Sequence, residues 1–463
     1  MCTNYVLSPY LRIVKRGEEF AVYNTLRSGS LIFLDEKALN FLLEFKSGKQ
    51  IEEGRQVLSE EERDAFEIFI QNDYIQSLGL DLRLQLKTEA QAYRKRVRDG
   101  LELRGMVLEV TKHCNFGCKY CFSEQLSKKG SRQADTHMKS DVARSAIDSL
   151  FTNAKRADIG NLEVSFLGGE PLLNWRLVRE ATEYACELSK ENDIGVSFGI
   201  TTNASAVDTK IAQYLFIKKF RISVSVDGLG SVNDAVRTMR NGKGTFSRIA
   251  KGLELLLSSG NDVTVLTTIT DKNLNLINDD FVSWLAVAGV RNWGINLEDL
   301  AGDLTSDSIK VSEKIKELVL LADRHGVQAG GMWFKPVHAM VNKNTAYCSS
   351  ASGNFLSVEP DGSVYACSKT NQRYGHVSDL RGIFENLNYL ESATRVAGSL
   401  PGCSGCNLEG HCMGSCMAVG QVTHESMTGC NTCSLVGKNK VACDFSRKLS
   451  EEILSSPEIP LFG

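Results

Sequence analysis

Between residues 104 and about 300, short runs of apolar and β-branched residues alternate with longer amphipathic stretches. The pattern predicts strands over 106–110, 163–167, 196–200, 221–226, 263–269 and 292–297, with helices that include 140–151, 208–218, 246–257 and 279–288. Strands that alternate with helical segments of this kind are typical of βα units on a parallel sheet. We therefore predict an α/β fold with six βα units, which is fewer than a closed eight-stranded barrel needs.

The first 90 residues form a separate block with a different pattern. Residues 19–23 and 30–34 alternate like the strands of a hairpin, with Arg27-Ser-Gly29 at the turn. Helical periodicity follows over 36–45 and 59–71. This order predicts a small winged-helix-like α+β module, and the charged stretch 87–104 is expected to connect it to the barrel.

Composition and charge narrow the class of protein. The chain has 463 residues, of which 42% are hydrophobic and 24% charged, as in ordinary soluble globular proteins. Its 53 Lys and Arg nearly balance 56 Asp and Glu, so no basic surface for nucleic acid is expected. The first ten residues lack the apolar core of a signal peptide, and no stretch approaches the length of a membrane span. We expect a cytoplasmic protein without a membrane or nucleic-acid partner.

The 14 cysteines favour metal ligation over disulfides, because a chain without an export signal stays where thiols are reduced. Cys114, Cys118 and Cys121 directly follow the expected strand 106–110. Three thiolates at this spacing suit three corners of a cubane iron-sulfur cluster and leave the fourth iron open. A structural zinc site would normally take four ligands, and a zinc knuckle is the alternative. A second group lies in the tail: Cys348, Cys367, Cys403, Cys406, Cys412, Cys416, Cys430, Cys433 and Cys443.

A glycine-rich motif, Gly168-Gly-Glu-Pro171, follows the expected strand 163–167 as the cysteine triplet follows its own strand. The C-terminal ends of barrel strands form the face where chemistry is done. Two glycines allow close approach of the backbone to a bound amino acid, and the Glu170 carboxylate can accept hydrogen bonds from an ammonium group.

The CxxxCxxC spacing, together with Gly168–Pro171, resembles the radical S-adenosylmethionine (radical SAM) superfamily. The resemblance implies a partial (β/α)6 barrel and a 4Fe-4S cluster whose open iron binds the amino and carboxylate groups of the methionine moiety. Reductive cleavage would then give a 5'-deoxyadenosyl radical. It also implies cofactor-binding roles for Gly168, Gly169 and Glu170 at the methionine amino group, and for Asn203, Ser225 and Arg237 at later strand ends. Arg237 is expected to hold the carboxylate, because its planar fork binds carboxylates in bidentate fashion.

The tail resembles the SPASM extension of radical SAM enzymes, through Cys348, Cys367 and the run Cys403-x2-Cys406-x5-Cys412-x3-Cys416. The resemblance implies two auxiliary 4Fe-4S clusters, and so three clusters in all. By the family's interleaved pattern, Cys348, Cys367 and Cys416 would serve the first, and Cys403, Cys406 and Cys412 the second. The final ligand stays open among Cys430, Cys433 and Cys443. The alternative is a zinc ribbon on Cys403/Cys406 and Cys430/Cys433.

The expected organisation is a recognition module over 1–90, a radical SAM barrel over 100–310, a linker over 311–345 and a SPASM domain over 346–463. The first module resembles the recognition elements that capture the leader of a ribosomally made precursor peptide by adding it to a sheet edge. A structural cap over the barrel is the alternative.

This resemblance implies a peptide maturase that forms a thioether or carbon-carbon cross-link and takes electrons from a flavodoxin- or ferredoxin-type reductant. An anaerobic sulfatase-maturating enzyme and a non-catalytic Fe-S regulator are the rival readings. Asp227 and Glu298, on strand-end loops, are candidate proton acceptors.

Overall fold

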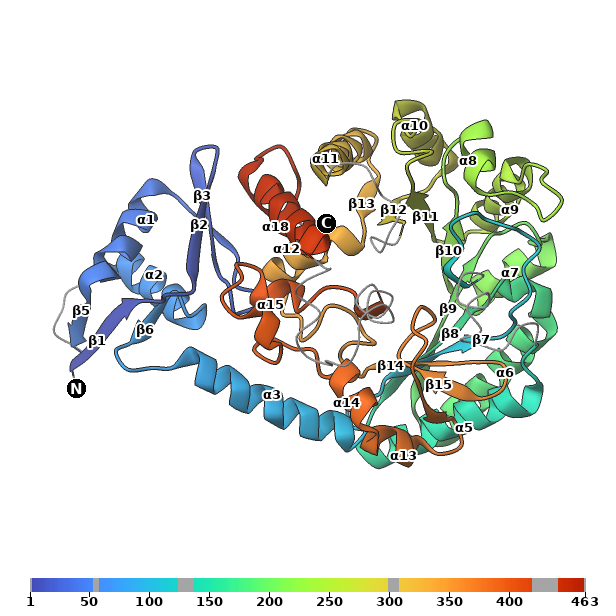
Figure 1. The fold of residues 1–463 in the computed structure, drawn as a ribbon, viewed down its shortest axis with the longest axis horizontal. Helices are drawn as coiled ribbons and strands as arrows, with labels where there is room; N and C mark the ends of the chain where they lie inside the picture. The colour runs from blue at the N-terminus through green and yellow to red at the C-terminus, as the bar shows by residue number, and fades with distance from the viewer. Residues whose placement is uncertain (1, 53–57, 124–136, 299–307, 419–439, 462–463) are drawn as a thin grey trace.

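The computed structural model describes residues 2–52, 58–123, 137–298, 308–418 and 440–461. Figure 1 shows the N-terminal module on the left, a curved sheet with helices around its outside on the right, and the C-terminal part between them. No helix in these ranges has both the length and the apolar character that crossing a bilayer requires.

Within the described residues, the main sheet has ten strands in the order β13-β12-β11-β10-β9-β8-β7-β14-β15-β16. They are β7 (Gly105–Glu109), β8 (Asn161–Leu167), β9 (Gly195–Thr202), β10 (Arg221–Ser225), β11 (Val263–Ile269), β12 (Asn292–Leu297), β13 (Gln328–Gly330), β14 (Phe355–Val358), β15 (Ser363–Tyr365) and β16 (Arg373–His376). Pairing is parallel from β13 to β14, and antiparallel between β14, β15 and β16. The partial α/β barrel and its six expected strands are confirmed, while β13 and β14 extend the parallel sheet beyond six.

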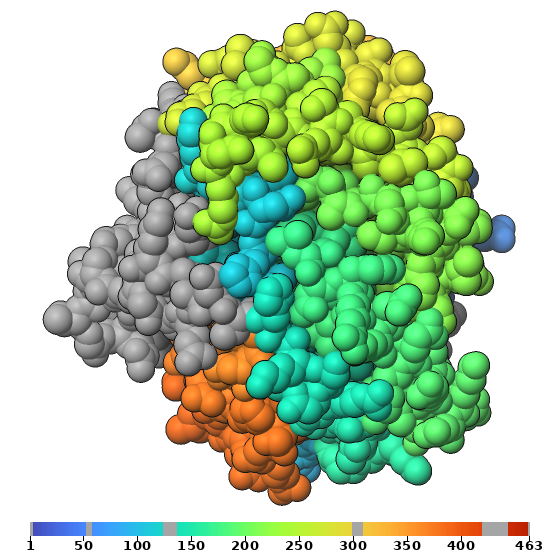
Figure 2. All heavy atoms as spheres, turned by 90° about the vertical axis from the view of Figure 1, so that its right-hand side faces the viewer, coloured from blue at the N-terminus to red at the C-terminus, as the bar shows by residue number. Residues whose placement is uncertain are grey.

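Helices cover the outer face of this sheet (Figure 1). They are α5 (Ser140–Ala157), α6 (Trp175–Asn192), α7 (Thr209–Ile217), α8 (Ser231–Val236), α9 (Phe246–Ser258), α10 (Asp279–Ala288) and α11 (Ser308–Arg324). The apolar stripe of α5 includes Ile147 and Leu150, which are buried in one core with Val164 and Phe166 of β8. Figure 2 shows α5 bordering the α13 region, where Ser149 Oγ donates to the Val377 carbonyl over 3.0 Å. The helices therefore leave the inner face and the strand ends to form the site.

The N-terminal module contains two small sheets, β5-β1-β6 and β2-β3-β4. Their strands are β1 (Cys2–Leu7), β2 (Leu11–Arg16), β3 (Glu19–Asn24), β4 (Ile32–Leu34), β5 (Lys49–Glu52) and β6 (Ile75–Ser77), with helices α1 (Glu36–Leu43), η1 (Glu44–Ser47) and α2 (Glu60–Gln71). The expected hairpin is confirmed as β3 and β4, and β2 adds a further strand before it. Ser59 and Glu62 form a capping box that begins α2.

The stretch expected to be only a connector is a helix, α3 (Leu82–Arg98), which links the module to the barrel (Figure 1). Its charged residues hid the helical pattern, because the helix buries only Leu82, Leu86 and Val97 among its 17 residues. The Asp81 carboxylate caps its start by accepting from Leu84 N.

The region expected as a linker, 311–345, contains most of α11, together with β13, η3 (Met332–Phe334) and α12 (Lys335–Val341). Strands β14 and β15 form an antiparallel hairpin before Cys367, with a turn at Gly362, whose φ is 84°. The remaining elements are η2 (Pro171–Asn174), α13 (Leu380–Glu385), α14 (Leu387–Ala393), η4 (Pro401–Cys403), α15 (Glu409–Cys412) and α18 (Lys440–Ser455). The amphipathic run after Cys443 lies in α18, which packs against α11 and α12.

Candidate functional site

The cysteine triplet lies in the loop that follows β7. Cys114, Cys118 and Cys121 are half-buried, and the first two pack against the main core. Burial is the largest cause that raises the pKa of Cys114 to about 12 and that of Cys118 to about 11; neighbouring thiols contribute to the rise, and the Arg237 guanidinium opposes it at Cys118. A metal must displace these protons to bind, because a thiolate is the ligand.

The glycines of Gly168–Pro171 allow this loop to pack against the chain just before Cys114. Gly169 N donates to the Thr111 carbonyl and Glu170 N to the His113 carbonyl, each over 2.8 Å. An added Cβ would lie 2.3 Å from Thr111 O at Gly168 and 2.2 Å from His113 O at Gly169. The close neighbour of both glycines is thus the cysteine loop itself, and their contact with a bound amino acid stays a prediction.

Glu170 is fully buried and joins the ends of β8 and β9. Its Oε1 accepts from Thr202 Oγ1 over 2.6 Å and from Leu172 N over 3.0 Å, while Oε2 accepts from Asn203 N over 2.7 Å. Burial raises the pKa of this carboxyl, and the hydrogen bonds oppose that rise. Glu170 therefore fixes the loop that carries Asn203, and its contact with a methionine ammonium stays a prediction.

Asn203 extends this network to the cysteine loop. Its Nδ2 donates to Asn115 Oδ1 over 2.9 Å and lies 4.0 Å from Cys114 Sγ. Ser225 is the last residue of β10, is half-buried and stands opposite Leu266 of β11. The structure thus brings Asn203 to the cysteine triplet, while the role of Ser225 stays a prediction.

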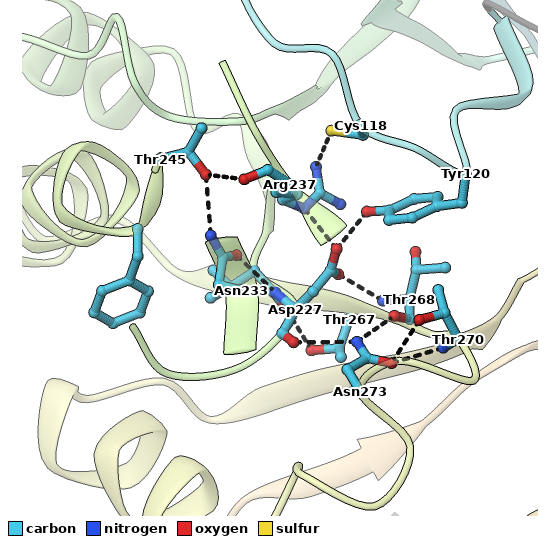
Figure 3. A network of polar contacts seen from close by, with 12 residues as sticks. Cys118, Tyr120, Asp227, Asn233, Arg237, Thr245, Thr267, Thr268, Thr270 and Asn273 are labelled. Carbon is cyan, nitrogen blue, oxygen red and sulfur yellow. Dashed lines mark hydrogen bonds and ion pairs between the residues drawn. The ribbon is translucent and has the colours of Figure 1, made fainter. Parts of the chain in front are cut away.

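Arg237 lies between the cysteine loop and Asp227 (Figure 3). Its Nη1 donates to Cys118 Sγ over 3.8 Å, and its Nε lies 2.9 Å from Asp227 Oδ2. Tyr120, inside the cysteine motif, donates its hydroxyl to the same Asp227 oxygen, and its ring lies 5.5 Å from the guanidinium carbon. Sequence reasoning missed Tyr120 and this ion pair. The only signal was that an aromatic hydroxyl stands between two expected ligands.

Asp227 is fully buried, and both of its carboxylate oxygens are engaged (Figure 3). Oδ1 accepts from Thr268 N over 2.8 Å, while Oδ2 receives Tyr120 and faces Arg237. This arrangement disfavours Asp227 as the acceptor of a substrate proton. The other candidate, Glu298, directly follows β12, is half-buried and donates its N–H to the Ile269 carbonyl over 2.8 Å.

Arg237 retains a donor that suits a carboxylate ligand. Its buried Nε forms an ion pair with Asp227 Oδ2 at 2.9 Å, but this contact lacks the alignment of a good hydrogen bond. Buried donors are normally satisfied, so a poorly aligned donor in a buried guanidinium can serve a better-aligned acceptor. The residues present therefore fit the methionine carboxylate of S-adenosylmethionine.

The tail cysteines that the structure describes fall into two electrostatic groups. In the first group, burial and then the nearby thiols of Cys416 and Cys348 raise the pKa of Cys367. In the second group, burial raises the pKa of both Cys403 and Cys412. The thiols of Cys406 and Cys443 add to the rise at Cys403, and the thiols of Cys403, Cys406 and Cys443 add to it at Cys412. Cys430 and Cys433 lie outside the described residues. No three His, Cys, Asp or Glu side chains in the described part of the chain are close enough to hold a single metal ion.

Comparison with known proteins identifies the superfamily. Residues 108–325 match the family model of the radical SAM superfamily. The chain is a radical SAM enzyme. Its cofactors are therefore S-adenosylmethionine and the 4Fe-4S cluster that cleaves it.

Two relatives show the extent of the similarity. The radical SAM cyclopropyl synthase TigE of Paramaledivibacter caminithermalis is 24% identical, covering 97% of this chain and 95% of the relative. A cysteine-type anaerobic sulfatase-maturating enzyme of Clostridium perfringens strain 13 is 22% identical, covering 67% of this chain and 88% of the relative.

Two solved structures share the fold. Native anSMEcpe with bound AdoMet has a TM-score of 0.60 at 18% identity, covering 76% of this chain and 99% of that one. Streptococcus suis SuiB bound to the precursor peptide SuiA has a TM-score of 0.52 at 14% identity, covering 89% of this chain and 96% of that one. At these identities the likeness concerns the fold alone.

Proposed function

We propose that this enzyme modifies a ribosomally made precursor peptide by forming a thioether or carbon-carbon cross-link. The observation that carries the proposal is the match to a radical SAM cyclopropyl synthase along 97% of the chain, N-terminal module included. The likeness in fold to SuiB, which was solved with a precursor peptide, supports the substrate class. Because a cyclopropyl ring closes through a carbon-carbon bond, this class of bond is favoured over a thioether.

The reaction removes two hydrogens from the peptide and forms one bond. When bound, the cluster and S-adenosylmethionine supply a 5'-deoxyadenosyl radical, which takes the first hydrogen as an atom. The second hydrogen would leave as a proton, and an auxiliary cluster, when bound, would accept its electron. A flavodoxin- or ferredoxin-type reductant supplies the electron for each cleavage. Glu298, at the end of β12, is the remaining candidate for the proton acceptor.

The strand ends would hold the cofactors. Cys114, Cys118 and Cys121 would each bind one iron, which leaves the fourth iron open to S-adenosylmethionine. Arg237, whose buried Nε–H is poorly aligned with Asp227, would hold the methionine carboxylate. Gly168, Gly169, Glu170, Asn203 and Ser225, at the ends of β8, β9 and β10, would complete the pocket.

The tail would hold two auxiliary 4Fe-4S clusters. Cys348, Cys367 and Cys416 would bind the first. The grouping of Cys443 with Cys403, Cys406 and Cys412 favours it as the fourth ligand of the second, in preference to Cys430 or Cys433.

The N-terminal module would bind the leader peptide along β2. In the sheet β2-β3-β4, as the described residues form it, β2 and β4 are the outer strands, and α18 contacts β2. Just before β4, Gly29 and Leu31 donate their N–H groups to carbonyls of α12. On β2, residues 12, 14 and 16 face β3, so the backbone of Ile13 and Lys15 faces outward, and both residues are exposed. An extended leader can add a strand there.

The test is anaerobic incubation of the reconstituted enzyme with reductant, S-adenosylmethionine and the peptide encoded by a short reading frame beside its gene. We expect 5'-deoxyadenosine and a peptide that is lighter by the mass of two hydrogens. An aldehyde at a Cys or Ser of a sulfatase-derived peptide, with no cross-link in the precursor peptide, would favour the sulfatase-maturating reading. Absence of any 5'-deoxyadenosine would favour a regulator.

A further inference from the structure

Arg237 is shared between two negatively charged partners of different kinds. One is Cys118, a thiolate once it binds iron, 3.8 Å from Nη1. The other is Asp227, whose Oδ2 lies 2.9 Å from Nε. A guanidinium that approaches one partner more closely withdraws from the other, so whatever holds Asp227 also decides how strongly Arg237 acts on Cys118 (Figure 3).

Asp227 has little freedom to move. Its backbone N–H donates to Asn233 Oδ1 over 3.1 Å, and its carbonyl accepts from Asn273 Nδ2 over 3.2 Å. Thr268 N holds Oδ1. The remaining oxygen, Oδ2, receives the Tyr120 hydroxyl and faces Arg237, so the phenol competes with the guanidinium for the same atom (Figure 3).

This arrangement acts on the charge of an iron-sulfur cluster. Hydrogen bonds to ligand sulfurs and nearby positive charge stabilise the more negative, reduced state, and so raise the reduction potential. The Asp227 carboxylate opposes this effect by neutralising the guanidinium. The Tyr120 hydroxyl weakens that opposition, because it donates to the oxygen that Arg237 would otherwise have alone.

We propose that Tyr120 and Asp227 are positioning residues that set how closely the Arg237 guanidinium approaches Cys118, and thereby set the reduction potential of the radical SAM cluster. Their effects have opposite signs: Tyr120 raises the potential, and Asp227 lowers it. The proposal rests on Cys118 as a cluster ligand and does not depend on the identity of the peptide.

The experiment is a redox titration of the reconstituted holoenzyme, followed by electron paramagnetic resonance, without S-adenosylmethionine or peptide. The signal of this cluster is the one missing from a Cys114→Ala variant. We expect Asp227→Asn to raise the midpoint potential and Tyr120→Phe to lower it, at unchanged iron content. Tyr184→Phe is the matched control, because it removes a phenol that donates to Asp148 on the outer helices.

Two further measurements keep the test decisive. Arg237→Gln removes the positive charge beside Cys118 and should lower the midpoint potential by more than Tyr120→Phe does. If Asp227→Asn does not fold, Tyr120→Phe and Arg237→Gln decide the matter. Shifts of the same sign in Asp227→Asn and Tyr120→Phe, or no shift in Tyr120→Phe, would overturn the proposal. Neither result would affect the peptide cross-link, which is measured by mass.

Discussion

The backbone N–H of Gly410 donates to the carbonyl of Thr25 over 2.7 Å, and this bond joins the cysteine-rich segment to the N-terminal module. Beside it, Nε2 of buried His411 lies 2.9 Å from the Asn24 carbonyl. An added Cβ at Gly410 would lie 2.4 Å from the backbone of Leu26. The N-terminal module therefore supports the segment that carries Cys406 and Cys412. Removal of the module would leave buried polar groups of that segment without hydrogen-bond partners.

Gly410→Ala should destabilise the protein and empty the second auxiliary site. The new methyl group forces the two backbones apart, at a cost of about 1–3 kcal/mol. We expect a lower unfolding temperature and an iron content that falls from about twelve to about eight per chain, because one cubane holds four. Gly160→Ala is the control, since nothing lies within 4 Å of a Cβ there. Full iron content in Gly410→Ala would contradict the role of this contact.

Point substitutions on β2 test leader binding better than deletion of the module, because deletion would also disturb the cysteine-rich segment. Ile13→Asp together with Lys15→Glu should weaken binding of a labelled leader peptide and slow cross-linking at least tenfold. Cleavage of S-adenosylmethionine without peptide should persist, since the barrel is untouched. The control is Ile217→Asp, which places a charge at an exposed apolar residue of α7. Equal leader affinity in both variants would refute the β2 site.

Replacing Cys114, Cys118 and Cys121 together with Ala should remove about four irons and all cleavage of S-adenosylmethionine. The auxiliary sites should keep about eight irons, because their thiols lie on other elements. Iron analysis and release of 5'-deoxyadenosine are the measurements. Cys186→Ala, at a half-buried thiol of α6, should change neither quantity. Cleavage that survives in the triple variant would sink the assignment of the triplet.

Single substitutions identify the last ligand of the second auxiliary cluster. Cys443→Ala should alter or remove the signal of one auxiliary cluster, because Cys443 is grouped with Cys403, Cys406 and Cys412. Cys430→Ala and Cys433→Ala should keep it. The measurement is iron content together with the paramagnetic resonance of the reduced protein. Loss of the signal in Cys433→Ala but not in Cys443→Ala would reverse the assignment.

The sequence by itself determined the repeating unit and the edge of the sheet that carries the chemistry. Strand β11, for example, alternates buried and half-buried residues over Val263–Ile269. This local period can be recognised in the sequence without knowing which strands lie beside it. The cysteine triplet and Gly168–Pro171 each follow a strand, so parallel order alone brings them to one edge. The short spacings between cysteines predicted the cluster ligands for a similar reason, because ligands that are close in sequence can be recognised without the tertiary structure.

Only the tertiary structure decided what residues distant in the chain do to one another. The parallel pairing of β14 with β7 joins the cysteine-rich part to the barrel sheet, and no local pattern reports which strands become neighbours. The charges in the sequence do not reveal that Arg237 pairs with Asp227 as well as facing a ligand. They also do not reveal that the Tyr120 hydroxyl donates to the same Asp227 oxygen. Such contacts depend on distances across loops, because hydrogen bonds and ion pairs act over a few ångströms while sequence spacing fixes distance only within one element.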